Sequence, residues 1–319
     1  MKTFDILFFQ PEFIREVQQG LGSRALSAFK SGPDYFVLPS TSEPDNREYV
    51  WCQQVWMGAQ LFSYNSISDA VKKLKSLHRG GWIGASISHH RRAALIGESL
   101  KVRKEKPIDF MSPLAQNARA GFCLLDEKTI LFCAKVHPPF PRGQMQFQET
   151  QEAPSRAYLK LWELFTVYGI APQKDELVID MGSCPGGWTW VLSNLGAHVL
   201  SVDKAPLDSR LQDSSNVKYI KHDAFTLRPQ DIQAKYGKVD WFFSDIICEP
   251  PRLVDLIMRW RKEVAVSKFV CTVKFKGQTD MAPVEELLKI NGSWAVHLHH
   301  NKHELTWISG VAKPDPTVP

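Results

Sequence analysis

The stretch that decides the fold of the C-terminal half reads Val178-Ile179-Asp180-Met181-Gly182-Ser183-Cys184-Pro185-Gly186-Gly187-Trp188-Thr189. It begins as an apolar run, passes through a turn with three glycines and continues as a helical pattern. Glycines in such a strand-to-helix turn permit positive φ angles and let the backbone approach a ligand closely. Their spacing is not G-x-G-x-x-G, so the turn disfavours a nicotinamide dinucleotide.

Two acidic residues extend this pattern. Asp203 ends the next apolar run, 21 residues after Gly182, where a carboxylate can accept hydrogen bonds from a ribose diol. Asp223 follows the third run and can accept a hydrogen bond from an adenine amino group. A tight turn between a strand and a helix would explain Gly186-Gly187 alone, whereas the whole set favours a site for a nucleoside-containing cofactor.

Strand-like and helix-like segments alternate through the region around this turn. We expect strands at 177–179, 198–202, 217–220, 241–243, 268–274 and 305–308, and helices at 159–168, 189–195, 230–236, 251–260 and 282–290. Such alternation predicts a Rossmann-like, doubly wound α/β domain with a parallel sheet over 153–310. Ligands bind such sheets beyond the carboxyl ends of the strands.

The N-terminal half has a different character and predicts a separate α+β domain over 1–145. Short extended runs at 3–9 and 35–38 accompany a helix that Ser66 opens with a capping motif and that runs to about His78. A Pro- and Gly-rich stretch at 136–143 indicates a linker or domain edge. Residues 311–319 are expected to form a disordered tail. Two domains agree with a length of 319 residues.

Composition narrows the setting of the protein. The formal charge of +5 is compatible with a polyanionic partner, although it is weak evidence by itself. The six cysteines are dispersed, no apolar run is long enough for a membrane span, and we therefore expect a cytoplasmic protein. Four histidines lie close together, but H-E-x-x-H and the usual zinc-ligand spacings are absent, so we expect no metal; the four are His297, His299, His300 and His303.

The motif D-M-G-S-C-P-G-G-W at 180–188 resembles the first motif of the FtsJ-type RNA 2′-O-methyltransferases, D-L-G-A-x-P-G-G-W. The lead-in at 153–161 is similar to that of the branch of this family that modifies large-subunit ribosomal RNA. The resemblance covers about residues 153–310 and implies S-adenosylmethionine as the cofactor. We expect the cofactor to be bound by Asp180, Gly182, Ser183, Cys184, Pro185, Gly186, Gly187, Trp188, Asp203, Asp223 and Asp245.

The resemblance also implies a catalytic tetrad of two lysines and two acids. Members of the family use K-D-K-E, and Lys160, Asp245, Lys274 and Glu304 match it in order and context. Lys274 would accept the proton of a ribose 2′-hydroxyl, Asp245 and Lys160 would position it and the ribose, and Glu304 would complete the charge network. A single lysine or aspartate at a strand end is more often a solvated loop residue. The set of four behind a matching cofactor motif favours catalysis.

Two departures weaken the match at one end of the tetrad. The segment after Asp245 is one residue longer than in the family and carries a second carboxylate, Glu249, of undefined role. The residue before Glu304 is His303 where the family usually has arginine. The local sequence around Glu304 therefore differs from that of the family.

The expected partner is RNA, most specifically ribosomal RNA or a ribosomal precursor. The basic stretches at 89–92 and 101–106 can contact phosphates, and the related branch carries an N-terminal THUMP-type RNA-binding domain. Trp51, Trp56 and Trp82 can stack on bases or lie in the core. The alternatives are a methyltransferase with another acceptor and a non-catalytic factor that binds S-adenosylmethionine and RNA.

Overall fold

The glycine turn joins strand β8 (Leu177–Met181) to helix α5 (Gly187–Asn194) in the computed structural model. The structure describes residues 2–41, 46–102, 104–114 and 119–313. The chain divides into two compact units, and the division falls between Gln146 and Phe147. The turn and all residues of the expected site therefore belong to the C-terminal unit.

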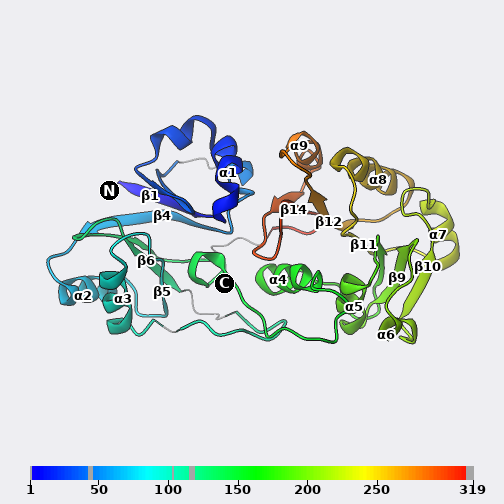
Figure 1. The fold of residues 1–319 in the computed structure, drawn as a ribbon, viewed down its shortest axis with the longest axis horizontal. Coiled ribbons are helices and arrows are strands. Elements are labelled where there is room, and N and C mark those ends of the chain that lie inside the picture. The colour runs from blue at the N-terminus through cyan, green and yellow to red at the C-terminus, as the bar shows by residue number, and fades with distance from the viewer. Residues whose placement is uncertain (1, 42–45, 103, 115–118, 314–319) are drawn as a thin grey trace. The chain divides into compact units, whose positions relative to one another are not determined.

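The C-terminal unit is built on a seven-stranded sheet with the order β10-β9-β8-β11-β12-β14-β13. Besides β8, its strands are β9 (His198–Asp203), β10 (Val217–Lys221), β11 (Trp241–Ser244), β12 (Lys268–Lys274), β13 (Trp294–Val296) and β14 (Glu304–Ser309). Its helices are α4 (Tyr158–Tyr168), α5, α6 (Ser209–Gln212), α7 (Pro229–Tyr236), α8 (Pro250–Glu263) and α9 (Ala282–Leu288). Figure 1 shows α4 and α5 on one face of this sheet and α8 and α9 on the other, which confirms the doubly wound α/β architecture.

The prediction of a parallel sheet holds for β8 to β12 and is wrong beyond them. β14 runs antiparallel to β12, and β13 runs antiparallel to β14. Only residues 297–303 join β13 to β14, and a connection of that length cannot form the crossover that parallel neighbours need. The antiparallel register places Glu304 opposite Lys274.

Helix α4 is almost entirely buried, and two of its buried side chains are charged. Its residues 158–167 are all buried, and they include Lys160 and Glu163. The helix ends at Gly169, whose φ of 63° is in the left-handed region. A buried charge is stable only when it is paired or hydrogen-bonded, so both side chains need partners from neighbouring elements.

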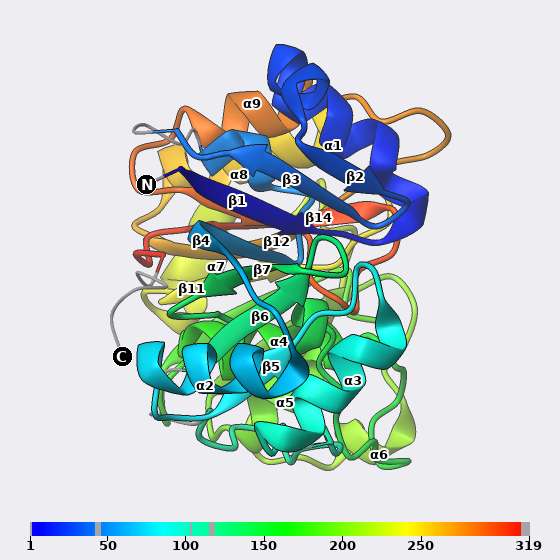
Figure 2. The same cartoon turned by 90° about the vertical axis from the view of Figure 1, so that its left-hand side faces the viewer.

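The N-terminal unit contains a second seven-stranded sheet, with the order β2-β3-β1-β4-β7-β6-β5 (Figure 2). Its strands are β1 (Thr3–Phe8), β2 (Lys30–Gly32), β3 (Tyr35–Pro39), β4 (Gln54–Ser63), β5 (Trp82–Gly84), β6 (Ala120–Leu124) and β7 (Thr129–Cys133). Its α-helices are α1 (Ile14–Leu21), α2 (Ile67–Leu77) and α3 (His90–Ser99). The predicted cap of α2 is confirmed, because the Ser66 side chain accepts a hydrogen bond from the Asp69 backbone N–H at 3.1 Å.

The structure decides between alternatives that the sequence left open for this unit. Trp51, Trp56 and Trp82 are all buried and pack into the core of the unit, so they are not available to stack on bases. The Pro- and Gly-rich stretch at 136–143 lies just before the boundary between the two units, and the buried Gln54 side chain anchors it by donating hydrogen bonds to the Pro138 and Phe140 carbonyls at 2.6 and 2.8 Å.

Two further points concern the whole chain. No helix within the described ranges combines the length and the apolar composition that crossing a bilayer requires. The expected tail at 311–319 falls largely on 314–319, which lie outside the described residues.

Candidate active site

A pocket of about 410 Å³ opens at the carboxyl ends of β8 to β12. Every residue predicted to bind the cofactor lines it except Gly186, which lies just before α5 and faces Leu211. Lys274 also lines the pocket, whereas Lys160 is connected to the pocket through Asp245, and Glu304 is connected to Asp245 through Lys160. The predicted cofactor site and the predicted catalytic tetrad are therefore continuous.

Two glycines of the turn leave no room for a side chain. Gly182 has a φ of 75°, and a Cβ atom there would lie 2.8 Å from the Ile246 side chain. A Cβ atom on Gly187 would collide with the Ser155 hydroxyl and lie 3.1 Å from the Ser155 carbonyl oxygen. Both glycines are thus required because backbone from the segments after β11 and before α4 approaches the turn closely.

Trp188 contributes to the framework of the pocket. Its indole N–H donates to the Ala157 carbonyl at 3.0 Å, and its ring meets the Phe243 ring edge to face. The tryptophan is buried and ties the start of α4 to α5. It therefore fixes the pocket wall rather than offering a free polar group.

Asp203 and Asp223 are both held by backbone amides. The Asp203 carboxylate accepts from the N–H groups of Cys184 and Ala205 at 3.0 and 2.9 Å, one on each oxygen. Asp223 accepts from the Phe225 N–H at 2.9 Å, which lowers the pKa of Asp223. Each carboxylate oxygen has a second lone pair, so both residues can still accept hydrogen bonds from a ligand.

Asp180 differs from these two acids because it is buried. Its carboxylate accepts from the Thr189 hydroxyl at 2.7 Å, which in turn lies 3.0 Å from the Ser201 hydroxyl. Burial raises the pKa of Asp180 to about 7, and the charges of Asp245 and Asp203 act in the same direction. Asp180 therefore gains or loses its proton near neutral pH.

An S-adenosylmethionine molecule fits the donors and acceptors that this pocket presents. The buried Ser183 hydroxyl lines the pocket and has no hydrogen-bond partner among the residues that the structure describes. A buried polar group without a partner is costly, and a polar ligand removes that cost. Asp203 and Asp223 supply carboxylates, Phe225 and Ile246 supply apolar surface, and the glycine turn supplies close backbone.

The tetrad residues, predicted from four separate parts of the sequence, meet in space. The Lys160 amine lies 2.7 and 2.9 Å from the Asp245 carboxylate oxygens and 2.9 Å from a Glu304 oxygen. The Lys274 amine lies 3.0 Å from the Asp245 carboxylate and donates to the Asp245 carbonyl at 2.6 Å. Asp245 thus bridges the two lysines, and Lys160 bridges the two acids.

The environment keeps Lys160 positively charged. Burial by itself lowers the pKa of Lys160, but the charges of Asp245 and Glu304 and the hydrogen bonds to them outweigh burial and raise it. The side chain is 10% exposed. Lys160 is therefore a fixed cation that orients Asp245, and it is unsuited to accept a proton.

The two departures in the sequence have separate structural explanations. Glu249 occupies the N-cap position of α8 without a side-chain capping hydrogen bond, and its carboxylate lies 3.2 Å from the Lys276 amine, with both side chains exposed. His303 lies 2.7 Å from the Thr279 hydroxyl and stacks near Phe275. Glu249 thus pairs with Lys276, and His303 contacts Thr279.

The histidine cluster is held by a carboxylate. Glu163 accepts hydrogen bonds from the backbone N–H groups of His299 and His300, and the ring of His300 lies 2.6 Å from the same carboxylate. His297 is buried and bonds to the Lys302 carbonyl at 3.0 Å. Within the described ranges no group of three or more histidine, cysteine or acidic side chains could hold a metal ion.

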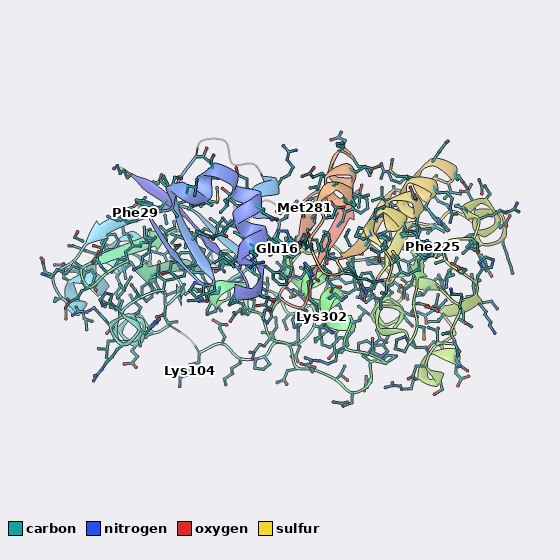
Figure 3. All side chains as sticks on the ribbon, turned by 45° about the horizontal axis from the view of Figure 1, so that its top comes forward. Glu16, Phe29, Lys104, Phe225, Met281 and Lys302 are labelled. Carbon is teal, nitrogen blue, oxygen red and sulfur yellow. The ribbon has the colours of Figure 1, made fainter. Side chains whose placement is uncertain are left out.

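Several residues that line the pocket were not predicted from the sequence. The Arg252 guanidinium lies 3.6 Å from the centre of the Phe225 ring, and both line the pocket. Figure 3 labels Phe225, which lies in the segment between β10 and α7. The aromatic residue two positions after Asp223 was the available signal for it. Nothing in the spacing pointed to Ser155, Ala157, His222 or Arg252, because separate loops bring them together.

Comparisons with known proteins agree with this geometry. Residues 153–304 match the family model described as FtsJ-like methyltransferase. The protein named ribosomal RNA large subunit methyltransferase M in Shewanella halifaxensis is 32% identical, over 81% of this chain and 79% of that protein. Its namesake in Shewanella sp. strain MR-7 is 31% identical, over 94% of this chain and 95% of that protein.

A third relative matches over a shorter part of the chain. The protein of the same name in Tolumonas auensis is 31% identical over 53% of this chain, and the match covers 49% of that protein, about half its length. The two longer matches extend into both units. The chain therefore belongs to the family of ribosomal RNA large subunit methyltransferase M and carries an FtsJ-like methyltransferase domain over residues 153–304.

Proposed function

We propose that this protein methylates a ribose 2′-hydroxyl of RNA with S-adenosylmethionine, and that its substrate is large-subunit ribosomal RNA. The observation that carries the proposal is the Lys160–Asp245–Lys274–Glu304 cluster beside a pocket with the features of a nucleoside site. The named activity of the relatives supports ribosomal RNA as the substrate.

Different pocket residues would hold different parts of the cofactor. Asp203 accepts hydrogen bonds from the ribose diol and Asp223 from the adenine amino group, while Ser183 and the amides of the glycine turn bind the amino-acid end. When bound, S-adenosylmethionine supplies a methyl group on a positively charged sulfur, which makes the methyl carbon electrophilic.

Lys274 is the proton acceptor in this proposal. A ribose hydroxyl is a weak acid, so a positioned base and alignment with the methyl group provide most of the catalysis. Asp245 occupies two of the three hydrogen-bonding directions of the Lys274 amine, and no other described residue forms a hydrogen bond or ion pair with it. Lys274 in its neutral form takes the hydroxyl proton along the remaining direction, while Lys160 stays charged and holds Asp245 in place.

The N-terminal unit is assigned the binding of RNA, as a THUMP-type domain would provide. Exposed basic residues on and after α3 include Arg91, Lys101 and Lys104, and Figure 3 labels Lys104. Cations of this kind bind phosphates with an affinity that falls as salt rises. We also propose that the protein acts in the cytoplasm, where ribosomal RNA is found in bacteria such as those that carry its relatives.

The experiment that tests the function uses tritiated S-adenosylmethionine and RNA from cells that lack the gene, offered both as free RNA and as ribosomal particles. After alkaline hydrolysis, label should remain in alkali-resistant dinucleotides, because a methylated 2′-oxygen cannot attack the neighbouring phosphate. Label in mononucleotides would indicate a base as acceptor, and label in protein would indicate a protein acceptor. No label on either substrate would favour a non-catalytic factor.

A further inference from the structure

Helix α4 carries a second buried charge, Glu163, three residues after Lys160. Its side chain is 6% exposed and accepts three hydrogen bonds from one short turn. The His299 N–H lies 2.7 Å from one oxygen; the His300 N–H and ring Nδ1 lie 2.9 and 2.6 Å from the other. Because a carboxylate only accepts, Nδ1 of His300 carries the proton that is donated.

The turn that Glu163 holds leads directly to Glu304. Asn301 closes the turn with its N–H to the Leu298 carbonyl at 3.0 Å, and its side-chain amide donates to the Glu304 carbonyl at 3.2 Å. The Lys302 N–H lies 3.3 Å from the Glu304 carboxylate. The turn thus fixes both the backbone and the carboxylate of the last tetrad residue.

The same helix therefore holds β14 at two points. Lys160 pairs with the Glu304 side chain, and Glu163 anchors the turn before it. Phe147 packs against both the His300 ring and Trp162 of α4, which covers this contact with apolar surface. In such a dry setting hydrogen bonds to a carboxylate are strong and directional.

We propose that Glu163 is a positioning residue for methyl transfer, which sets the place of Glu304 and through it the orientation of Lys160 and Asp245. The inference rests on the proposed function of the tetrad. Glu163 touches neither pocket nor tetrad in the contacts of the described residues, so its effect passes through the turn at 298–301.

The test is the substitution Glu163→Gln, with Glu176→Gln as a matched control. A glutamine keeps one acceptor oxygen and turns an amide nitrogen toward a backbone N–H, so at least one of the three hydrogen bonds is lost. Glu176 also accepts three hydrogen bonds, from Gln173, Trp241 and Lys268, but it lies at the opposite end of the sheet, just before β8.

We expect kcat for RNA methylation to fall roughly ten- to a hundredfold in Glu163→Gln, the range that a misplacement of about 1 Å produces. The Kd for S-adenosylmethionine should stay close to the wild-type value, because Ser183, Asp203 and Asp223, which are assigned its hydrogen bonds, lie outside the turn at 298–301 that Glu163 holds, and backbone N–H groups elsewhere in the chain hold the two aspartates. Glu176→Gln likewise removes hydrogen bonds of an acceptor carboxylate but should leave kcat unchanged. Equal kcat values in the two variants would overturn the proposal.

A second measurement separates this inference from the proposed function. In protein labelled with ¹⁵N-lysine, the ammonium signal of Lys160, assigned with Lys160→Arg, should broaden in Glu163→Gln through faster hydrogen exchange and stay sharp in Glu176→Gln. This signal is measured without RNA. If the wild-type protein had no methylation activity, the proposed function would be refuted, but the positioning role of Glu163 could still be tested. An unchanged Lys160 signal in Glu163→Gln would end the positioning role.

If Glu163→Gln does not fold, the variant Glu163→Asp tests the positioning role. It keeps the charge and both acceptor oxygens but shortens the side chain by one methylene, so the turn must move or lose hydrogen bonds. The same loss of kcat at unchanged cofactor Kd is expected, and full activity would contradict the proposal.

Discussion

Replacing Lys160 with methionine tests the central cation of the tetrad. Methionine retains most of the length and apolar stem of lysine but removes the charge that lies 2.7 Å from Asp245 and 2.9 Å from Glu304. Lys274 remains 3.0 Å from Asp245 and continues to neutralise it. Glu304, whose side chain is 7% exposed, therefore loses its compensating charge.

The expected magnitude follows from these distances. Two unit charges about 3 Å apart attract by roughly 5–6 kcal/mol at an effective dielectric constant of about 20. The lysine no longer needs to be desolvated, so the net loss of stability is about 3–5 kcal/mol, as for other broken buried pairs. For a unit of this size each kcal/mol lowers the melting temperature by roughly 2–4 °C, which predicts a fall of about 6–20 °C.

Differential scanning calorimetry of the C-terminal transition at pH 7.5 measures this fall. A matched control is Lys268→Met, which breaks a more exposed pair with Glu176 at 2.9 Å, whose side chains are 33% and 21% exposed, and should cost less than about 1 kcal/mol. Adding Glu304→Gln to Lys160→Met should restore most of the loss, because no uncompensated charge remains. A loss in Lys160→Met no larger than in the control, or no recovery in the double variant, would refute the electrostatic account of the cluster.

Three further predictions concern catalysis, pH and packing. Lys274→Ala should bind S-adenosylmethionine normally in calorimetric titration yet lose methyl transfer by about 10²–10⁴-fold in the tritium assay, and full activity would remove Lys274 as the base. Burial raises the pKa of Asp180 from 3.8 to about 7, so between these pH values the folded protein keeps a proton that the unfolded chain releases. The free energy of unfolding should therefore fall as pH rises from 3.8 toward 7. In Asp180→Asn the urea midpoint should depend less on pH over this range. Gly187→Ala should lower the free energy of unfolding by about 1–3 kcal/mol and weaken cofactor binding, because the new Cβ atom meets the Ser155 backbone. Normal cofactor binding would show instead that α4 can move away.

The fold of the C-terminal unit could be predicted well from the sequence for a local reason. Parallel strands buried between helices are apolar runs with helical patterns between them, so each element has its own periodicity. The sequence missed β13 and the antiparallel direction of β14. A three-residue strand has too few residues for a periodic pattern, and direction depends on which neighbour a strand pairs with.

The candidate site shows the same division. The glycine turn, Asp203 and Asp223 were identified from spacing, because they occupy fixed positions relative to their own strands. Lys160 and Glu304 were matched only through family resemblance, since no local pattern relates a residue on α4 to one on β14. Trp188, which was expected to bind the cofactor, lines the pocket, and only the tertiary structure shows that its indole N–H is bonded to the Ala157 carbonyl.

The sequence by itself thus determined the strand-turn-helix unit around Gly182 and the chemical types that surround it. The tertiary structure decided how charges are paired: that Lys160 bridges Asp245 and Glu304, and that Glu163 holds the turn at His299 and His300. The physical reason is that local periodicity specifies elements over a few residues. Ion pairs between α4 and residues 85 or more positions away arise only when the sheet brings the strand ends together under that helix.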